Sequence, residues 1–284
     1  MQNFVTMDLE GWAASSWALL GPAEAGRARL AGAIDDPQLE RGARAFVDSL
    51  DRHGRRATFF VDAAILPRHG GLVREIGARG HEIASHALRH APFETLGRSA
   101  MREELRDSRG RLEDLLGAEV IGFRAPHLLR RGAPAGFFEE LLAAGYRYDS
   151  SLTSEWARRT LGAGDAPFPV PGATELFEYP VSSHSLPLGA CTLGGTRLAL
   201  VSRVRLLRWA GAANAAGSPV VLYAHPYELD RGPLRWRHPR PSPRARLAAA
   251  TRALLRRGRA AMIEAVLAEL PCSTIAADLR ARAG

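Results

Sequence analysis

Short apolar runs alternate with longer amphipathic segments along the first 150 residues of the chain. Residues 57–62 have the length and the β-branched and aromatic content of a buried strand, whereas 37–53 repeats apolar residues at helical spacing and stops at Gly54. The same reasoning predicts strands at 3–8, 57–62, 81–85, 120–124 and 146–150, and helices at 37–53, 71–78, 99–116 and 137–144. Such alternation is typical of a parallel sheet covered by helices.

The second half of the chain is less regular. Residues 156–188 are rich in proline and glycine, so we expect loops and short strands there, over one face of a barrel. The pattern then predicts a basic helix at 200–213, a strand at 219–223, a loop at 231–243, helices at 246–256 and 260–270, and a strand at 273–276. Because no long linker or repeat divides the chain, we predict a single α/β domain over residues 1–284, with 231–284 as a C-terminal helical extension packed on it.

The composition is that of a folded globular protein, with 46% hydrophobic and 24% charged residues. No apolar run reaches the length of about 18 residues that a membrane span needs, and the first residues do not have the pattern of a secretory leader. Two cysteines, Cys191 and Cys272, show no metal-site or disulfide pattern. These features favour a cytoplasmic protein, with a peripheral position at the inner face of the membrane as an alternative.

The formal net charge is +8, and every basic residue is arginine, a bias that a GC-rich genome explains at least as well as a polyanionic partner. The basic stretches at 197–208 and 231–259 lack interleaved stacking aromatics beyond Trp209 and Trp236. We therefore expect no nucleic-acid partner. An anionic or membrane-associated substrate stays open, and Arg203, Arg205 and Arg208 could contact its phosphate unless they form a solvated basic face.

Two carboxylates lie at the end of the first predicted strand, in the segment TMDLEGW. Asp8 and Glu10 are two residues apart, so on a strand their side chains point to the same face. At the carboxyl end of that strand they would project into a barrel mouth. The alternative is a solvated pair of strand-end carboxylates, against which Trp12 and a nearby histidine pair argue.

The histidine pair lies in the segment GHEIASHALRH. His86 and His90, at a spacing of four, would share one face of a helical turn and could bind one ion. With the two carboxylates they form a His₂–carboxylate set, which an open hydrolytic metal site requires. The alternative is that such histidines cap or pack, which is the interpretation we give to His81 and His184.

Two other segments place a polar residue after an apolar run. In GFRAP, Arg124 could pair with a carboxylate and hold it ionised. In LYAHPYELD, His225 could protonate a leaving group, because the unperturbed pKa of histidine is about 6.5. Residues 150–151, a Ser-Ser pair, lack the flanking glycines of a nucleophile elbow, so serine-hydrolase chemistry is not expected.

Together these segments resemble the polysaccharide deacetylase family, the metal-dependent carbohydrate N-deacetylases with a NodB-homology domain. The resemblance runs from Val5 to about Asp278 and rests on TMDLEGW, RATFFV, GHEIASHALRH, GFRAP, YRYDSSL and LYAHPYELD. The block after the last segment is similar to a subgroup associated with exopolysaccharide or glycoconjugate synthesis.

The resemblance implies a distorted (β/α)₇ barrel with one divalent metal ion, usually Zn²⁺, with Co²⁺, Ni²⁺ and Mn²⁺ as alternatives. By motif match Asp8 would be the general base, Arg124 would orient it and keep it ionised, and His225 would be the general acid. The metal ligands would be Glu10, His86 and His90.

The resemblance also implies supporting roles. Asp149 would be the carboxylate that raises the pKa of His225, and the backbone N–H of His127 would help to stabilise the oxyanion. Trp12 and Tyr227 would contribute to substrate binding. Three positions depart from the family pattern: many members have Asp at the position of Glu10, an aromatic residue at that of His127, and Trp at that of Tyr227. None of these removes a mechanistic group.

We therefore expect a metal-dependent hydrolase that removes an N-acetyl group from an amino sugar, carried by a glycoconjugate, a lipid- or nucleotide-linked sugar or an aminosugar intermediate. One alternative is a deformylase or a ureide or cyclic-amide hydrolase on the same fold. Another is a catalytically inactive carbohydrate-binding protein, against which the intact set of site residues argues. The sequence does not indicate the oligomeric state.

Overall fold

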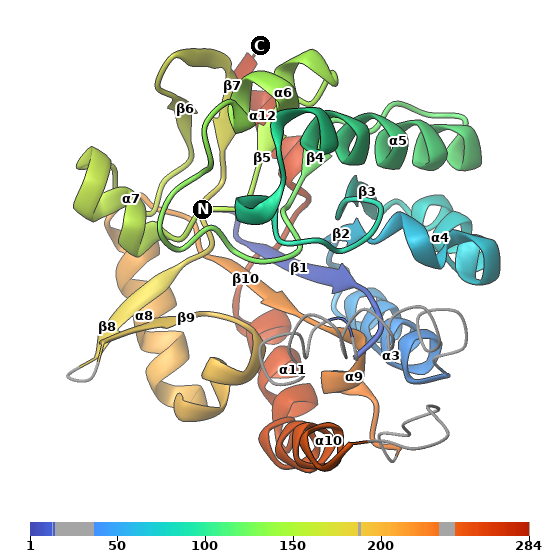
Figure 1. The fold of residues 1–284 in the computed structure, drawn as a ribbon. Coiled ribbons are helices and arrows are strands. Elements are labelled where there is room, and N and C mark those ends of the chain that lie inside the picture. The colour runs from blue at the N-terminus through green and yellow to red at the C-terminus, as the bar shows by residue number, and fades with distance from the viewer. Residues whose placement is uncertain (13, 15–36, 187–188, 233–241, 284) are drawn as a thin grey trace.

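A curled sheet of mainly parallel strands forms the centre of the computed structural model, which describes residues 1–12, 14, 37–186, 189–232 and 242–283 (Figure 1). The strand order is β10-β1-β2-β3-β4-β5-β7-β6, in which only β6 is antiparallel to its neighbour. The strands are β1 (Phe4–Leu9), β2 (Thr58–Val61), β3 (Glu82–Ser85), β4 (Gly122–Phe123), β5 (Tyr148–Asp149), β6 (Phe168–Val170), β7 (Ala173–Glu178) and β10 (Val221–Ala224).

The chain that follows β7 spans the gap between β7 and β10. The N–H of Ser182 donates to the carbonyl of Val221 at 3.0 Å, and the N–H of Tyr223 donates to the carbonyl of Leu193 at 3.1 Å. A two-stranded antiparallel sheet, β8 (Ser183–Leu186) with β9 (Gly189–Thr192), lies within this connection. These contacts and the seven parallel strands make the structure a distorted (β/α)₇ barrel in a single α/β domain, as predicted.

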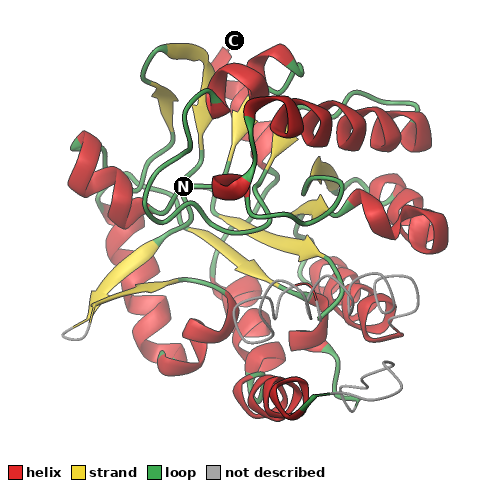
Figure 2. Cartoon of the chain, in the orientation of Figure 1, coloured by secondary structure: helices red, strands yellow, loops and turns green. Residues whose placement is uncertain are grey.

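Helices surround the sheet (Figure 2). The α-helices are α3 (Pro37–Arg52), α4 (Leu66–Ala78), α5 (Arg98–Leu116), α6 (Phe137–Ala143), α7 (Ser154–Leu161), α8 (Arg203–Ala215), α9 (Pro226–Leu229), α10 (Pro243–Leu255), α11 (Arg259–Glu269) and α12 (Ile275–Ala283). Short 3₁₀ turns are η2 (Ala63–Ile65), η3 (Phe93–Thr95) and η4 (Gly195–Leu200). Within the described part of the chain, no helix combines the length and the apolar character needed to cross a bilayer.

The alternation of side chains along β1 determines which residues face the barrel interior. Val5, Met7 and Leu9 pack with the covering helices in the main core cluster. Phe4 instead belongs to a second cluster inside the barrel. Because alternate residues of a strand share a face, Asp8 points to the interior side with Phe4. All six residues of β1 are buried, as expected for a strand covered on both faces.

The N-terminal end of the barrel is closed by α12 rather than by the strand predicted at 273–276. Ile275 packs in the interior cluster, and its N–H donates to Thr58 Oγ1 at 3.0 Å. Pairing with β1 ends at an isolated bridge between Asn3 and Cys272. The hydroxyl of Thr274 then accepts from the N–H of Ala277 at 3.2 Å, and this cap starts a helix where the sequence was expected to stay extended.

Two other elements differ from the prediction. Helix α4 begins at Leu66 and not at residue 71, because a proline fits the first turn of a helix and the two glycines that follow are tolerated inside it. Helix α7 occupies part of the region expected to be loops; Thr153 caps its start and Gly162, with φ 63°, ends it. Most of the loop expected at 231–243 lies outside the described residues.

Candidate metal centre and active site

The polar residues identified from the sequence lie at the carboxyl ends of parallel strands. Asp8 is near the end of β1 and Glu10 follows that strand, while His86, Arg124 and His225 follow β3, β4 and β10, respectively. Because parallel strands end at the same edge of the barrel, side chains far apart in sequence are brought together there. This edge is the candidate site.

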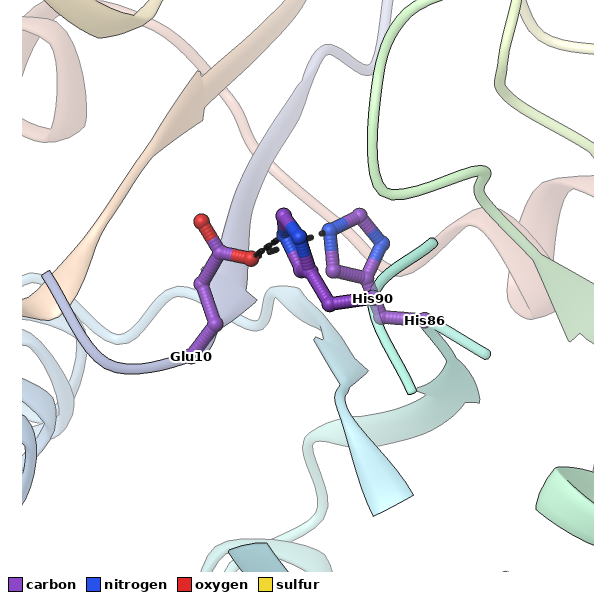
Figure 3. Close-up of side chains that lie close together, drawn as sticks. All are labelled: Glu10, His86 and His90. Atoms are coloured by element: carbon purple, nitrogen blue, oxygen red, sulfur yellow. Dashed lines mark ion pairs between the residues drawn. The ribbon is translucent and has the colours of Figure 1, made fainter. Parts of the chain in front are cut away.

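Glu10, His86 and His90 form a cluster that could hold a metal ion. One ligand atom from each lies within 4.8 Å of the others, and all three residues are buried. Glu10 Oε2 is 3.6 Å from His86 Nε2 and forms an ion pair with His90 Nε2. Figure 3 shows the carboxylate of Glu10 and the two imidazoles facing one another.

The tautomer of His86 suits a metal ligand. Its Nδ1 is 2.8 Å from the carbonyl oxygen of Arg124, and a carbonyl only accepts, so Nδ1 carries the proton. Nε2 then presents its lone pair toward Glu10. Burial lowers the pKa of His86 to about 3, which keeps the ring neutral, as metal ligation requires. This donor set of two imidazoles and a carboxylate therefore fits a divalent ion.

The two histidines are joined by an irregular bend and not by the helical turn that their spacing suggested. Ala87 and His90 both have positive φ, 63° and 51°, a backbone conformation that non-glycine residues seldom adopt. Glu104 of α5 holds the bend, because its Oε2 accepts two consecutive backbone N–H groups of this segment, each at 2.9 Å. The spacing correctly indicated a shared site, but the helical geometry was wrong.

Arg124 connects Asp8 in β1 to Ser150, the residue that follows β5. The guanidinium is fully buried, and its Nη1 donates to Asp8 Oδ1 at 2.8 Å and to Thr6 Oγ1 at 2.7 Å. Its Nε and Nη2 donate to the carbonyl and hydroxyl oxygens of Ser150 at 3.0 and 2.7 Å. Four hydrogen bonds thus hold the arginine in place, and one of them orients the Asp8 carboxylate.

The same contacts keep Asp8 ionised. Burial alone would raise its pKa, but the positive charge of Arg124, with His86 and His225, holds the pKa of Asp8 below its usual value. A buried carboxylate that stays charged and has a fixed orientation can accept a proton.

His225 is far from Glu10 in sequence but close to it in space, with Nε2 3.5 Å from Glu10 Oε1. Its Nδ1 is 3.2 Å from Glu228 Oε2, which also accepts the backbone N–H of His225 at 2.9 Å. Burial lowers the pKa of His225, but the hydrogen bond and charge of Glu228, together with the charges of Glu10 and Asp8, outweigh burial and raise the pKa overall. The Glu228 carboxylate is in turn 3.8 Å from Arg259 of α11.

Glu228 therefore takes the place that the sequence analysis gave to Asp149, and that expectation needs correction. The reason is local: Glu228 lies three residues after His225 in the first turn of α9, where its side chain reaches back to the start of the helix. This i to i+3 spacing was visible in the segment LYAHPYELD and is the signal that the sequence analysis missed.

Asp149 faces Glu178 instead, across the in-register pair of β5 and β7. Both residues are fully buried. Asp149 Oδ1 accepts from the hydroxyl of Ser151 at 2.5 Å, and Glu178 Oε1 accepts the backbone N–H of Leu152 at 3.0 Å. Burial raises the pKa of both carboxyls, that of Asp149 to about 6, and their closeness favours a shared proton. Because Ser151 also accepts the N–H of Ala125 at 2.8 Å, this pair supports the segment after Arg124.

Tyr227, expected to contact substrate, packs behind His225. Its ring stacks on the imidazole with centroids 5.4 Å apart, its hydroxyl accepts from Arg252 at 2.9 Å, and it is 1% exposed. Gly42 of α3 allows this arrangement, because a Cβ at that position would lie 1.8 Å from the carbonyl oxygen of Pro226. The segment that carries His225 is thus held from both sides.

The remaining predicted residues lie around the centre. The ring of His127 is edge-to-face with that of His90, with centroids 5.0 Å apart, and burial with His90 and His86 lowers the pKa of His127 to about 3. Trp12 is buried two residues beyond Glu10. His81 packs against the ring of Phe59, as expected of a histidine outside the site.

A family model described as polysaccharide deacetylase matches residues 26–148, which include both histidines of the cluster and Arg124. Residues 26–148 therefore form a polysaccharide deacetylase domain by sequence. A solved structure of a Mycobacterium smegmatis protein assigned to the polysaccharide deacetylases is 22% identical, with a TM-score of 0.62 over 100% of this chain and 92% of that one. The Puue allantoinase is 18% identical, with a TM-score of 0.54 over 95% and 91% of the two chains. Both likenesses concern the fold; the exopolysaccharide subgroup stays a prediction.

A cavity of about 1010 Å³ opens at the other end of the barrel, where its lining includes residues that precede β4 and β5 and residues of α12. None of the candidate site residues lines it. Its partly buried acid, Glu82, already accepts hydrogen bonds from the hydroxyls of Thr58 and Tyr148, both at 2.7 Å, and from the N–H of Ala276 at 2.9 Å. The candidate site therefore remains at the carboxyl ends of the strands, where barrels of this type keep their chemistry.

Proposed function

We propose that this protein is a metal-dependent amide hydrolase that removes an N-acetyl group from an amino sugar. One observation supports it above the others: the cluster of Glu10, His86 and His90 lies beside the Asp8–Arg124 pair and His225. A fixed ionised carboxylate, an imidazole with a raised pKa and a His₂–carboxylate set together match what hydrolysis of an unactivated amide needs.

The three ligand residues would hold one divalent ion. Zinc is the ion we propose, because two imidazoles and a carboxylate are a common zinc donor set, with Co²⁺, Ni²⁺ and Mn²⁺ as alternatives. When bound, such an ion polarises the acyl carbonyl and lowers the pKa of a water molecule. The neutral ring of His86, fixed through its Nδ1 by Arg124, is ready for this role.

Asp8 and His225 would move the two protons of the reaction. Asp8 takes a proton from the attacking water as the oxygen of that water bonds to the acyl carbon. Arg124 keeps the Asp8 carboxylate ionised until then. The C–N bond then breaks, and Nε2 of protonated His225 gives its proton to the leaving nitrogen, so acetate and a free amine result. Glu228 stabilises the imidazolium before that transfer. The backbone N–H of His127 would stabilise the negative charge on the acyl oxygen.

We also propose where the enzyme meets its substrate. Cys191 and Cys272 are buried free thiols, which fits a reducing compartment such as the cytoplasm. A lipid- or nucleotide-linked N-acyl amino sugar, or an aminosugar intermediate, is the substrate class that suits this location.

The test is a hydrolysis assay on the purified chain after treatment with a strong chelator. The substrates are an N-acetyl amino sugar, its N-formyl analogue and a cyclic ureide, each with and without added zinc or cobalt. Zinc-dependent release of acetate supports the proposal. Full turnover in metal-free protein would contradict the metal, preference for formyl or ureide would change the substrate, and binding without turnover would indicate an inactive carbohydrate-binding protein.

A further inference from the structure

The positive charge of the chain is concentrated in one segment. Residues 231–263 contain ten arginines and no acidic residue, so the rest of the chain has 28 arginines against 30 acidic residues. A general preference for arginine over lysine would not sort the charges in this way. The whole positive excess therefore belongs to the segment that contains α10 and the start of α11.

The outer face of α10 combines this charge with exposed apolar side chains. Pro243, Leu247, Ala250 and Leu254 follow the spacing i, i+4, i+7 and i+11, which places them on one face of the helix. Leu247 is 68% exposed and Leu254 60%. A helix on a protein surface normally turns its apolar stripe inward, so two exposed leucines on one stripe are unusual.

Exposed arginines flank this stripe. Arg244 and Arg246 lie beside Leu247 in the first turns of α10, and Arg257 lies just beyond the end of the helix. None of these three is among the described ion pairs. An apolar stripe bordered by arginines is the pattern of helices that lie in the plane of an anionic membrane surface.

The inner face of α10 and the residue that follows this helix contact the segment after His225. Arg252 Nη1 donates to the hydroxyl of Tyr227 at 2.9 Å, and Arg256 donates to the carbonyls of Tyr227 and Asp230 at 3.1 and 2.8 Å. These contacts join α10 to α9, the helix that directly follows His225. A surface bound to the outer face of α10 would therefore lie on the His225 side of the site.

We propose that the outer face of α10 docks on an anionic phospholipid bilayer. Leu247 and Leu254 enter the boundary between headgroups and acyl chains, and Arg244, Arg246 and Arg257 face lipid phosphates. The leucines favour a bilayer over nucleic acid, because they contribute nothing to phosphate contacts along a duplex. The inference concerns a surface separate from the metal cluster, so it stands or falls independently of the proposed hydrolysis.

The experiment is sedimentation of the full chain with vesicles of phosphatidylcholine, alone or with one quarter phosphatidylglycerol, at low and high salt. We expect binding to the anionic vesicles that weakens as salt screens the arginines. The double variant Leu247→Ser/Leu254→Ser and the double variant Arg244→Gln/Arg246→Gln should each reduce partitioning at least about tenfold, since each removes a large part of the interfacial contact.

Matched controls lie elsewhere on the surface. Leu161 of α7 is 39% exposed, and Arg74 and Arg147 are exposed beside the cavity at the opposite end of the barrel. Leu161→Ser and Arg74→Gln/Arg147→Gln should leave vesicle binding unchanged, and thermal unfolding checks that every variant is folded.

Four outcomes would overturn the proposal. The first is no binding to anionic vesicles, and the second is an equal loss of vesicle binding in the control variants. The third is binding of duplex DNA that depends on the arginines but not on the leucines. The fourth is a change in the mass measured by sedimentation velocity when the leucines are replaced, with vesicle binding intact. The third would make the face a nucleic-acid site and the fourth an interface between two copies of the chain.

Discussion

The change Asp8→Asn tests whether the two carboxylates at the end of β1 have different roles, Asp8 as general base and Glu10 as metal ligand. Asparagine has the same shape and still offers an oxygen to Arg124, which donates to Asp8 Oδ1 at 2.8 Å, but it cannot accept the proton of a water molecule. Loss of a general base typically costs a factor of about 10² to 10⁴ in rate. This corresponds to roughly 3 to 5 kcal/mol of transition-state stabilisation. Because Asp8 is not one of the three clustered ligands, metal content should stay normal.

The effect of this change on stability also follows from the contacts. Arg124 keeps its hydrogen bonds to Thr6 and Ser150, so the variant loses the negative charge of one acceptor and not the whole network. Hydrogen bonds to charged groups contribute about 1.5–3 kcal/mol, and we expect the free energy of unfolding of the metal-free variant to fall by about that amount at neutral pH.

The pH dependence has a definite sign. The folded-state pKa of Asp8 is lowered, so its stabilising contribution is complete above the unfolded-state pKa of about 3.9 and is lost as the pH falls through the folded-state value. The difference between wild type and Asp8→Asn should therefore be constant at neutral pH and should shrink in acid. Urea unfolding of the metal-free proteins at several pH values measures it.

The assay combines turnover, metal content by mass spectrometry and urea unfolding. Asp51→Asn is the control, because Asp51 is 42% exposed and pairs with Arg79 at 3.0 Å on the surface. It should change stability by less than about 0.5 kcal/mol and leave turnover unaltered. If Asp8→Asn loses the metal while Glu10→Gln keeps it, the two carboxylate roles are exchanged. Wild-type turnover in Asp8→Asn would refute the role of general base.

Three further predictions address the surroundings of the cluster. Glu104→Ala should release the bend between the histidines and so weaken metal affinity about 10- to 100-fold in a metal titration. The control Glu103→Ala, at a neighbouring residue that is 51% exposed, should leave the affinity unchanged. Equal effects of the two variants would mean that the bend needs no support from Glu104. His225→Ala should reduce the rate of amide hydrolysis by a factor of about 10² or more but spare hydrolysis of an activated ester. Glu228→Gln should lower the pKa of His225 and so move the alkaline limb of the pH–rate profile to lower pH. An unmoved limb would exclude Glu228 as the partner of His225. The raised pKa values of Asp149 and Glu178 mean that the folded state binds more protons than the unfolded state, so wild-type stability should fall as the pH rises from about 4 through the folded-state pKa values. Urea unfolding at several pH values should show a flatter slope for Glu178→Gln. An unchanged slope would argue against a proton shared by the two carboxyls.

The position of the site followed from the sequence because each of its segments ends an apolar run. The alternation in β1 placed Asp8 and Glu10 on one side, and the strand ends brought them to the same edge as His86 and His225. The route between the two histidines could not be predicted from their spacing. It depends on Glu104, which approaches from another helix, and on positive φ at Ala87, for which the sequence gives no sign.

Other misses have different causes. Glu228 was within local reach of His225, so a search for i+3 carboxylates would have found it. Helix α12 could not be distinguished from a strand over residues 273–276, because the choice depends on the packing of Ile275 inside the barrel and on the cap at Thr274. The pairing of Asp149 with Glu178 could be predicted only by knowing that β5 and β7 are neighbours in the sheet. The irregular sequence before β7 gave no indication of this.

The position of β1 between β2 and β10 affects how the chain is made. Phe4 pairs with Val221 and Met7 with Ala224, so one edge of β1 has no partner until more than 200 further residues have been synthesised. At about 5–20 residues per second, this wait lasts roughly 10 to 40 s. During that time an apolar strand offers its free N–H and C=O groups to any other strand in reach. A nascent chain stopped just before β10 should therefore associate with other chains, although all three of its candidate metal ligands have already been synthesised.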